Sequence, residues 1–391
     1  MHHGLVICIF LIAQMGLSQT VATQSLDTVP LFPEIQINIS ANQFNKLKSA
    51  QGVKLELKDA QMILNEDTAK VDNIHIRGNN SLNFKRKSFS VDLDKSVVIR
   101  TAQGKTHVKK FLLLSLIMDK NLWHSRWAFL MMNELSLFPL FNSFCTVSVN
   151  NEPQGIYLLV EKPHQATTRL KSTYMVRRGL DHKIDTEYDD TNSKEQAKLY
   201  RKQYYSLYNT ANLHGDSLLS HLNKSINLHS YFSWIGFNYL TMNGDYSDEL
   251  FLYINPSTGL YEAIGWDYDD LFRMSPHEGQ EVRKAQFGEK MIFSLEDSFD
   301  RMIAADPVVY SSYLKSLKNV LTICDSTLIT TTSQRVLNEL DHLNKNEAQR
   351  KATLYIDKEE FDIDKTHKDI KESMSFLLTR RRVALKKLSI D

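Results

Sequence analysis

The sequence predicts an α+β protein of two lobes, with a β-rich N-terminal lobe over residues 31–160 and a mostly helical C-terminal lobe over residues 161–391. Two observations lead to this prediction. Apolar residues alternate with a period of two up to Val160, and after it they recur at three- and four-residue spacings. A run of strands followed by a run of helices is typical of the α+β class.

The first 19 residues are interpreted as a signal peptide. Residues 5–12 form an apolar run that is too short to span a bilayer, and small or polar residues follow at Gly16 and Ser18. The alternative is a buried N-terminal helix, because the segment contains no Lys or Arg. A signal peptide predicts a protein that is secreted, periplasmic or held at the cell surface. No later apolar stretch is long enough for a stable membrane span.

The N-terminal lobe is expected to contain half-buried strands and one helix. The helix covers residues 121–137, with Asp119 near its N-cap. A hairpin is expected to join residues 145–149 to residues 156–160. Alternation also predicts strands at residues 35–39, 53–57, 74–76 and 89–93.

The C-terminal lobe is expected to be helical apart from one β-hairpin. The hairpin joins residues 249–254 to residues 260–264 through a turn at residues 255–259. Helical periodicity covers residues 195–210, 214–224, 226–243, 295–325, 330–350 and 364–388. The two cysteines that follow the signal peptide, Cys145 and Cys324, could form one disulfide, and neither has the spacing of a zinc site.

Charge is balanced over the chain but not along it. The 47 basic and 46 acidic residues leave a net charge of +1, which gives no electrostatic reason to expect a nucleic-acid partner. Residues 81–110 carry eight Lys or Arg against two acidic residues, whereas residues 241–300 carry thirteen acidic residues against four basic ones. Such runs are usually solvated faces, so the geometry of the acidic run decides its interpretation.

The hairpin is expected to bring two acidic clusters together, at residues 245–249 and 266–270. If its turn centres near Ser257, Asp248 or Glu249 lies opposite Trp266 or Asp267, and Asp245 lies near Asp269 or Asp270. Carboxylates this close repel one another unless a cation neutralises them. Hard oxygen ligands select Mg²⁺, Mn²⁺ or Ca²⁺, which predicts a metal site. The alternative is pairing with Arg273 or Arg283.

The basic segment contains a lysine on an apolar strand face. Lys87 shares that face with Phe89 and Val91, and an inward-facing lysine needs an anionic partner. A phosphate bridged through a metal to Asp267 would supply this partner. The alternative is that Lys87 extends along the strand end to reach solvent.

Four segments of the sequence form an ordered set. They are Arg77-Gly78-Asn79-Asn80-Ser81 with Lys87-Ser88-Phe89, Asp119-Lys120 with Arg126, Gly155 to Glu161, and Asn243-Gly244-Asp245 through Tyr253 to Trp266-Asp267-Tyr268-Asp269. Together they resemble the CotH family, the spore-coat-protein-H-like atypical kinases. The resemblance covers residues 31–391 and implies a protein-kinase-like fold that binds ATP and Mg²⁺ or Mn²⁺ between its lobes. It also implies transfer of the γ-phosphoryl group to Ser or Thr hydroxyls of an exported or surface protein.

The resemblance implies a role for each matching residue. Asp245 would orient the acceptor hydroxyl, and Lys87 would contact the nucleotide phosphates. Cofactor binding would also involve the backbone of Glu161 at the adenine, together with Arg77 and Asn79, and the metal ligands would be Asp267, Glu249 and Asp269.

Three positions depart from the family pattern. Glu249 stands where the family usually has Asn, and its added charge would alter the number or type of metal. Gly265 replaces a Pro, and Arg273 replaces a small residue. Pairing of Arg273 with Asp269 or Asp270 would leave a degraded or non-kinase member.

A second interpretation belongs to a different class. In it the protein is a non-catalytic exported binding or surface-assembly protein whose acidic cluster binds Ca²⁺ or is paired internally. Nucleotide binding that depends on Mg²⁺ or Mn²⁺ separates the two interpretations. A metal-dependent nuclease would need a far larger basic surface to hold its substrate.

Overall fold

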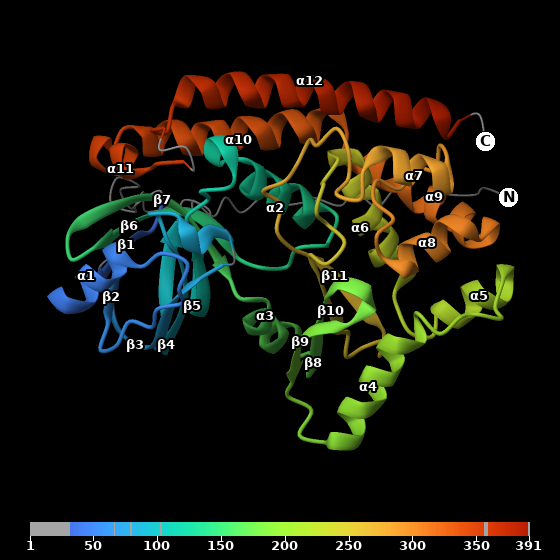
Figure 1. Cartoon of the computed structure of the whole chain (residues 1–391), viewed down its shortest axis with the longest axis horizontal. Coiled ribbons are helices and arrows are strands. Elements are labelled where there is room, and N and C mark those ends of the chain that lie inside the picture. Colours follow the sequence, from blue (N-terminus) through green and yellow to red (C-terminus); the bar gives the residue numbers. More distant parts are fainter. Residues whose placement is uncertain (1–31, 66, 79, 102–103, 356–358, 390–391) are drawn as a thin grey trace, which may run out of the picture.

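The computed structural model describes residues 32–65, 67–78, 80–101, 104–355 and 359–389. The predicted signal peptide, residues 1–19, lies outside this part of the chain. Seven strands form a barrel, four more form a second sheet, and helices make up most of the remainder, so the predicted α+β class is confirmed (Figure 1).

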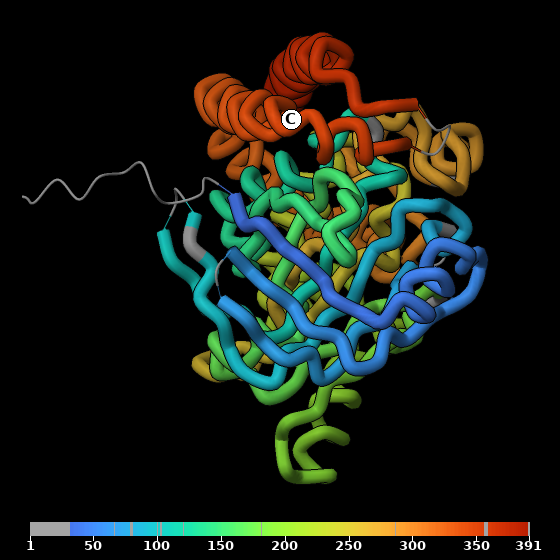
Figure 2. The backbone as a smooth tube through the Cα atoms, turned by 90° about the vertical axis from the view of Figure 1, so that its left-hand side faces the viewer, coloured from blue at the N-terminus to red at the C-terminus, as the bar shows by residue number. Residues whose placement is uncertain are grey.

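The N-terminal part is a closed barrel, which the sequence did not predict. Its strands follow the order β1-β2-β3-β4-β5-β7-β6, and parallel pairing of β1 with β6 closes it, with Glu34 opposite Thr146. Figure 2 views the molecule from the side of the barrel, whose first strands are blue. This pairing joins distant segments, and local alternation carries no information about it. The strands are β1 (Glu34–Asn38), β2 (Gln61–Leu64), β3 (Asp67–Arg77), β4 (Ser88–Thr101), β5 (Gly104–Leu114), β6 (Asn142–Val149) and β7 (Glu152–Glu161).

Alternating apolar residues point into the barrel and fill it. Ile74 and Ile76 from β3 and Phe89 and Val91 from β4 are almost completely buried there, as the alternation predicted. The prediction for residues 53–57 was wrong. They form no strand and make only one isolated bridge, from Glu56 to His75, after helix α1 (Ala41–Ser49).

The helix predicted for residues 121–137 is shorter in the structure. A short 3₁₀ turn, η3 (Lys120–Leu122), precedes α2 (His124–Glu134), and Asn121 and Leu122 have positive φ angles that separate the two. The carboxylate of Asp119 accepts hydrogen bonds from the backbone N–H groups of His124 and Ser125, at 3.0 and 2.8 Å. Asp119 therefore caps α2 from the far side of this turn.

A four-stranded sheet lies next to the barrel, in the order β11-β10-β8-β9. It contains the predicted hairpin, β10 (Leu250–Ile254) and β11 (Tyr261–Gly265), and Leu250 pairs with Gly265 in the predicted register. The other two strands, β8 (Tyr174–Arg178) and β9 (Ile184–Asp189), were missed, because they are short and lie in a region interpreted as helical. The short helix α3 (Pro163–Leu170) connects the barrel to this sheet.

Helices form the rest of the C-terminal part. The helix predicted over residues 295–325 is two helices, because Asp306 ends the first and caps the second, which begins at Pro307. The helices are α4 (Lys194–Ser206), α5 (Gly215–Leu222), α6 (Leu228–Thr241), α7 (Gln280–Phe287), α8 (Ser298–Ala305), α9 (Pro307–Ile323), α10 (Ser326–Asn344), α11 (Glu347–Ala352) and α12 (Ile363–Lys387).

The C-terminal helices contact both parts of the molecule. Helix α12 packs along α10 over the top of the structure in Figure 1, and α11 packs against β7 of the barrel. The side chains of Gln349 and Thr353 accept hydrogen bonds from the backbone N–H groups of Gly155 and Ile156, at 2.9 and 2.8 Å. The part of the chain after residue 161 therefore does not form a separate lobe, because α11 packs on the N-terminal barrel.

Both cysteines in the described part of the chain, Cys145 and Cys324, are buried free thiols, so the disulfide considered above is absent. Among the described helices, none combines the length and the apolar character needed to cross a membrane.

Candidate active site

A cavity of about 470 Å³ lies between one end of the barrel and the second sheet. The barrel contributes Arg77 at the end of β3 and the segment 114–119 after β5. The opposite wall is acidic and is formed by side chains around the β10–β11 hairpin. They are Asp245, Glu249, Asp267 and Asp269, and Arg177 from β8 lies beside them. A cleft of this size with charged groups of both signs is typical of a ligand site.

The hairpin brings the two acidic clusters together as its register predicted. The backbone N–H of Trp266 donates to the carbonyl of Glu249 at 3.0 Å, which extends the pairing by one residue beyond β10 and β11. The N–H of Gly244 donates to the carbonyl of Asp270, also at 3.0 Å. Residues 245–249 and 266–270 therefore face each other at the open end of the hairpin.

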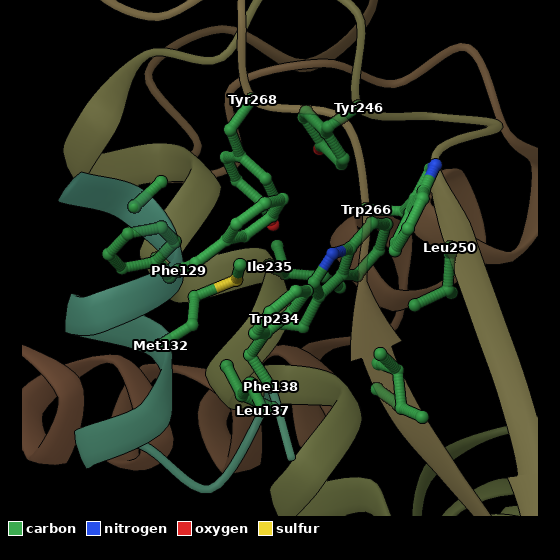
Figure 3. Close-up of a cluster of buried hydrophobic side chains, with 14 of the residues drawn as sticks. Phe129, Met132, Leu137, Phe138, Trp234, Ile235, Tyr246, Leu250, Trp266 and Tyr268 are labelled. Carbon is green, nitrogen blue, oxygen red and sulfur yellow. The ribbon is translucent and has the colours of Figure 1, made fainter. Parts of the chain in front are cut away.

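Aromatic packing turns Asp267 toward the cavity. Trp266 and Tyr268, its neighbours on either side, are buried in the apolar cluster of Figure 3, where Phe129 of α2 packs against both rings. The backbone of Asp267 has a φ angle of +45°, a conformation that is strained for an aspartate. Backbone strain of this kind concentrates at functional sites, because the surrounding packing has to maintain it.

The four cavity carboxylates have pKa values above their ordinary range. Burial is the main cause for all four, and it raises the pKa values of Glu249 and Asp269 well above normal. The negative charge of Asp267 adds to the effect on both of these residues. Their environment therefore disfavours so many negative charges, and an added cation would stabilise the ionised forms.

Two arginines from different sheets face these acids. Burial lowers the pKa of Arg77, and the charges of Asp267 and Glu249 oppose that effect. Arg177 forms an ion pair with Glu249 at 2.7 Å. Although burial disfavours the charge of Arg177, its acidic neighbours, with Glu249 first, raise its pKa. The added charge of Glu249, one of the departures from the family pattern, is thus matched by an arginine.

The arginines considered earlier as carboxylate partners behave differently from each other. Arg273 forms an ion pair with Asp270 at 3.2 Å. Arg283 donates instead to the backbone carbonyls of Ile292 and Gly288. Of the two arginines in the alternative to a metal site, Arg273 therefore pairs with a carboxylate and Arg283 does not, and the paired carboxylate is Asp270 rather than a predicted metal ligand.

Two predicted nucleotide-binding residues do not line the cavity. Lys87 is almost completely buried, and its ammonium group donates to the carbonyl of Leu82 at 2.6 Å rather than to an anion. The alternative, in which Lys87 extends along the strand end to reach solvent, is therefore wrong. Glu161 accepts the N–H of Phe141 at 3.0 Å and pairs with Arg169. Asn79 lies outside the described residues.

Carboxylates suited to a metal are present, but they do not form a complete cage. Within the described ranges no group of three or more His, Cys, Asp or Glu side chains is arranged to hold a metal ion alone. Mg²⁺ commonly binds through only one or two carboxylates together with phosphate oxygens. Asp267 and Asp269 supply the one or two carboxylates that such a site would need.

Two residues of the site could not be found from the sequence. Arg177 lies on β8, a strand that the helical interpretation missed, and His277 is an isolated histidine without a motif. In the structure Nδ1 of His277 lies 3.1 Å from Oδ1 of Asp245. The spacing of charged residues in the sequence did not indicate that Arg177 or His277 lies near the acidic clusters.

Several chains of solved structures match this chain, and the TM-scores of the following two are too low to support an argument. A Helicobacter pylori proinflammatory kinase, CtkA, shares 13% identity with a TM-score of 0.32, covering 75% of this chain and 94% of its own. A Shewanella oneidensis MR-1 HipA–HipB–operator DNA complex shares 11% identity with a TM-score of 0.28, covering 75% and 63%. No curated protein matches the chain significantly.

The family comparison is decisive. The model of the family described as CotH kinase protein matches residues 74–383, from β3 into α12. This match covers most of the chain and every site residue expected from the motifs. It supports a kinase-like function, and the chain belongs to the CotH kinase family, as its motifs predicted.

Proposed function

We propose that this protein is an exported atypical protein kinase that transfers the γ-phosphoryl group of ATP to Ser or Thr hydroxyls of a protein substrate, with Mg²⁺ or Mn²⁺. One observation carries the proposal. The cavity places Arg77 of the barrel opposite Asp245, Asp267 and Asp269 of the hairpin region. Phosphoryl transfer requires this combination, a cation for the phosphates and carboxylates for a metal and an acceptor.

Arg77 is the barrel residue best located to contact the phosphates. Its guanidinium lies in the field of Asp267 and Glu249, which line the same cavity. Lys87 does not line the cavity, and its ammonium group donates to the carbonyl of Leu82 in the turn 80–83. We therefore assign Arg77 to phosphate contact and Lys87 to support of that turn. A planar guanidinium can donate two parallel hydrogen bonds to a phosphate.

Asp245 and the metal carboxylates have separate tasks in this mechanism. Asp245 orients the acceptor hydroxyl and takes its proton as the hydroxyl oxygen bonds to the γ-phosphorus, while the bond from that phosphorus to the bridging oxygen breaks and ADP leaves. Asp267 and Asp269 would hold the metal, which neutralises phosphate oxygens when bound. Glu249 forms an ion pair with Arg177, and this pair stabilises the acidic side of the cavity.

The experiment is binding of a non-hydrolysable ATP analogue, measured by calorimetry with Mg²⁺, with Mn²⁺ and with EDTA. We expect metal-dependent binding that Asp267→Asn and Arg77→Gln abolish. Arg201→Gln is the control, because Arg201 forms an exposed ion pair with Glu187 on the surface. Loss of binding in Lys87→Met with retention in Arg77→Gln would return the phosphate role to Lys87.

Internal pairing of acidic residues favours one other function. Arg177 and Arg273 form ion pairs with Glu249 and Asp270, and His277 lies 3.1 Å from Asp245. A non-catalytic exported binding or surface-assembly protein would use such pairs as structural supports, with Ca²⁺ as its metal. Thermal stabilisation by Ca²⁺ alone, without any effect of the ATP analogue, would favour this function over the kinase.

A further inference from the structure

His277 connects two acidic residues that lie beside the cavity. Its Nδ1 lies 3.1 Å from Oδ1 of Asp245, and its Nε2 lies 3.3 Å from Oδ2 of Asp270. Its backbone N–H donates to the carbonyl of Gly244, the residue before Asp245, at 3.2 Å. Both the side chain and the backbone of His277 therefore contact the loop that carries Asp245.

Asp270, the second acidic residue next to His277, is itself held in place. Asp270 forms an ion pair with Arg273, with 3.2 Å between Oδ1 and Nε. The backbone of the same segment pairs with the end of α6, because the N–H of Phe272 donates to Thr241 at 2.9 Å and that of Arg273 to Met242 at 3.0 Å. His277 is thus attached to a segment with a fixed position relative to α6.

Asp245 needs such support because nearly half of its side chain is exposed to solvent, 49%. An exposed aspartate rotates freely about its side-chain bonds unless a partner holds one oxygen. Nδ1 of His277 lies within reach of Oδ1, and because a carboxylate only accepts hydrogen bonds, an N–H at Nδ1 would be the donor of this contact. That contact occupies Oδ1 and leaves Oδ2 for another group.

We propose that His277 is a positioning residue for Asp245, and that it holds Oδ1 so that Oδ2 is directed at the acceptor hydroxyl. This inference rests on the proposed kinase function, and it adds a residue that belongs to none of the four family-like segments. His277 itself does not touch ATP or the acceptor in this arrangement. Its loss should therefore affect the rate of transfer and leave nucleotide binding intact.

The test compares wild type, His277→Ala and His277→Asn in steady-state transfer to a generic protein acceptor such as casein, or in autophosphorylation. We expect His277→Ala to lower kcat about 10- to 100-fold, with KM for ATP and the affinity for the ATP analogue unchanged within about twofold. His277→Asn keeps a donor at the position of Nδ1 and should recover part of kcat. The control is His367→Ala, because His367 forms a similarly exposed pair with Asp341 at 2.8 Å and lies on α12.

A second variant covers the case in which His277→Ala folds poorly. Asp270→Asn leaves the imidazole in place but weakens its support, so it should lower kcat less than His277→Ala does. The double variant should be no slower than His277→Ala alone, because both changes act through one contact chain. Additive losses would overturn the inference.

The outcomes separate this inference from the proposed function. If wild type binds the ATP analogue and transfers phosphoryl groups while His277→Ala keeps its kcat, the inference falls and the kinase function stands. The same holds if His277→Ala loses analogue binding, because the residue would then support the nucleotide site instead. A wild-type protein that neither binds ATP nor transfers phosphate overturns both.

Discussion

The buried guanidinium of Arg178 supports the loop that carries Asp245. Arg178 is completely buried, and its Nε donates to the carbonyl of Ser247 at 2.6 Å. Two buried carboxylates surround it, with Asp297 at 3.5 Å and Asp300 at 3.6 Å. One positive charge thus faces two negative ones without solvent, which is unfavourable unless one carboxylate binds a proton.

Ionisation of the Asp300 carboxyl group should make the free energy of unfolding depend on pH. Burial raises the pKa of Asp300 from 3.8 to about 7, with Arg178 opposing the shift and Asp297 adding to it. Between these values the folded protein holds a proton that the unfolded chain has released. The free energy of unfolding should therefore fall as pH rises from about 4 to 7. Asp300→Asn, which cannot ionise, should lose this part of the slope.

Urea unfolding of both proteins at pH 5 and at pH 8 measures the effect. Wild type should lose more stability than Asp300→Asn between the two pH values, and Asp94→Asn, at an exposed position of β4, should behave as wild type does. Equal losses in wild type and Asp300→Asn would show that Asp300 ionises normally in the folded protein.

At the residue scale the sequence predicted the acids better than the bases. Asp245, Glu249, Asp267 and Asp269 belong to one local hairpin, whose register follows from its turn. The basic residues of the site come from other strands, Arg77 from β3 and Arg177 from β8. Lys87 shows why the position of a basic group is hard to predict from the sequence. A lysine has four rotatable bonds, so knowing which strand face carries it does not locate its ammonium group.

At the scale of elements the β10–β11 hairpin determines the site, and Gly265 at its end allows close packing. A side-chain carbon at this position would lie 2.5 Å from Oη of Tyr268 and 2.8 Å from Sδ of Met132. The family's proline has no space here, which accounts for this departure from the pattern. Packing therefore selects glycine where Trp266 and Tyr268 enter the core.

Gly265→Ala should destabilise the protein by about 1–3 kcal/mol, because the added methyl group overpacks a filled core. Removing the hydroxyl with Tyr268→Phe should recover part of this loss in the double variant. Thermal and urea unfolding of the two single variants and the double variant measure the coupling. If the two effects simply add, the added methyl group does not contact Tyr268.

Elements with strong periodicity were predicted well, and short ones were not. The β10–β11 hairpin and α12 agree with the prediction within a few residues. Strands β8 and β9 have only five and six residues, and their charged side chains hide any alternation. Pairing with β10 stabilises β8, and the sequence of β8 alone does not show this partner.

At the scale of the whole molecule the contact between α11 and β7 ties the C-terminal helices to the barrel. Gly155 makes this contact possible, because its φ angle is +106° and a side-chain carbon there would lie 2.6 Å from Oγ1 of Thr353. The barrel closure and this contact both join residues far apart in the chain. Neither could be predicted from local patterns, and for this reason the sequence suggested two simple lobes.

Gly155→Ala should loosen the segment around α11 and lower the free energy of unfolding by roughly 2–4 kcal/mol, from backbone strain and steric conflict together. Gly104→Ala is the matched control, since Gly104 has a φ angle of +125° but no atom of the described residues lies within 4 Å of the added carbon. Hydrogen exchange of α11 and urea unfolding measure both effects. Equal losses in the two variants would mean that strain alone accounts for the change.

The way the barrel closes also limits how the chain can fold during synthesis. Strand β1 must wait for β6, and two N–H groups of β7 find their partners only 194 and 197 residues later in the chain. All seven barrel strands have been synthesised once residue 161 is complete, but the contact of β7 with α11 cannot form until Gln349 and Thr353 have followed. Such distant contacts slow folding and leave an intermediate with exposed apolar surface, which is the kind of species that chaperones bind.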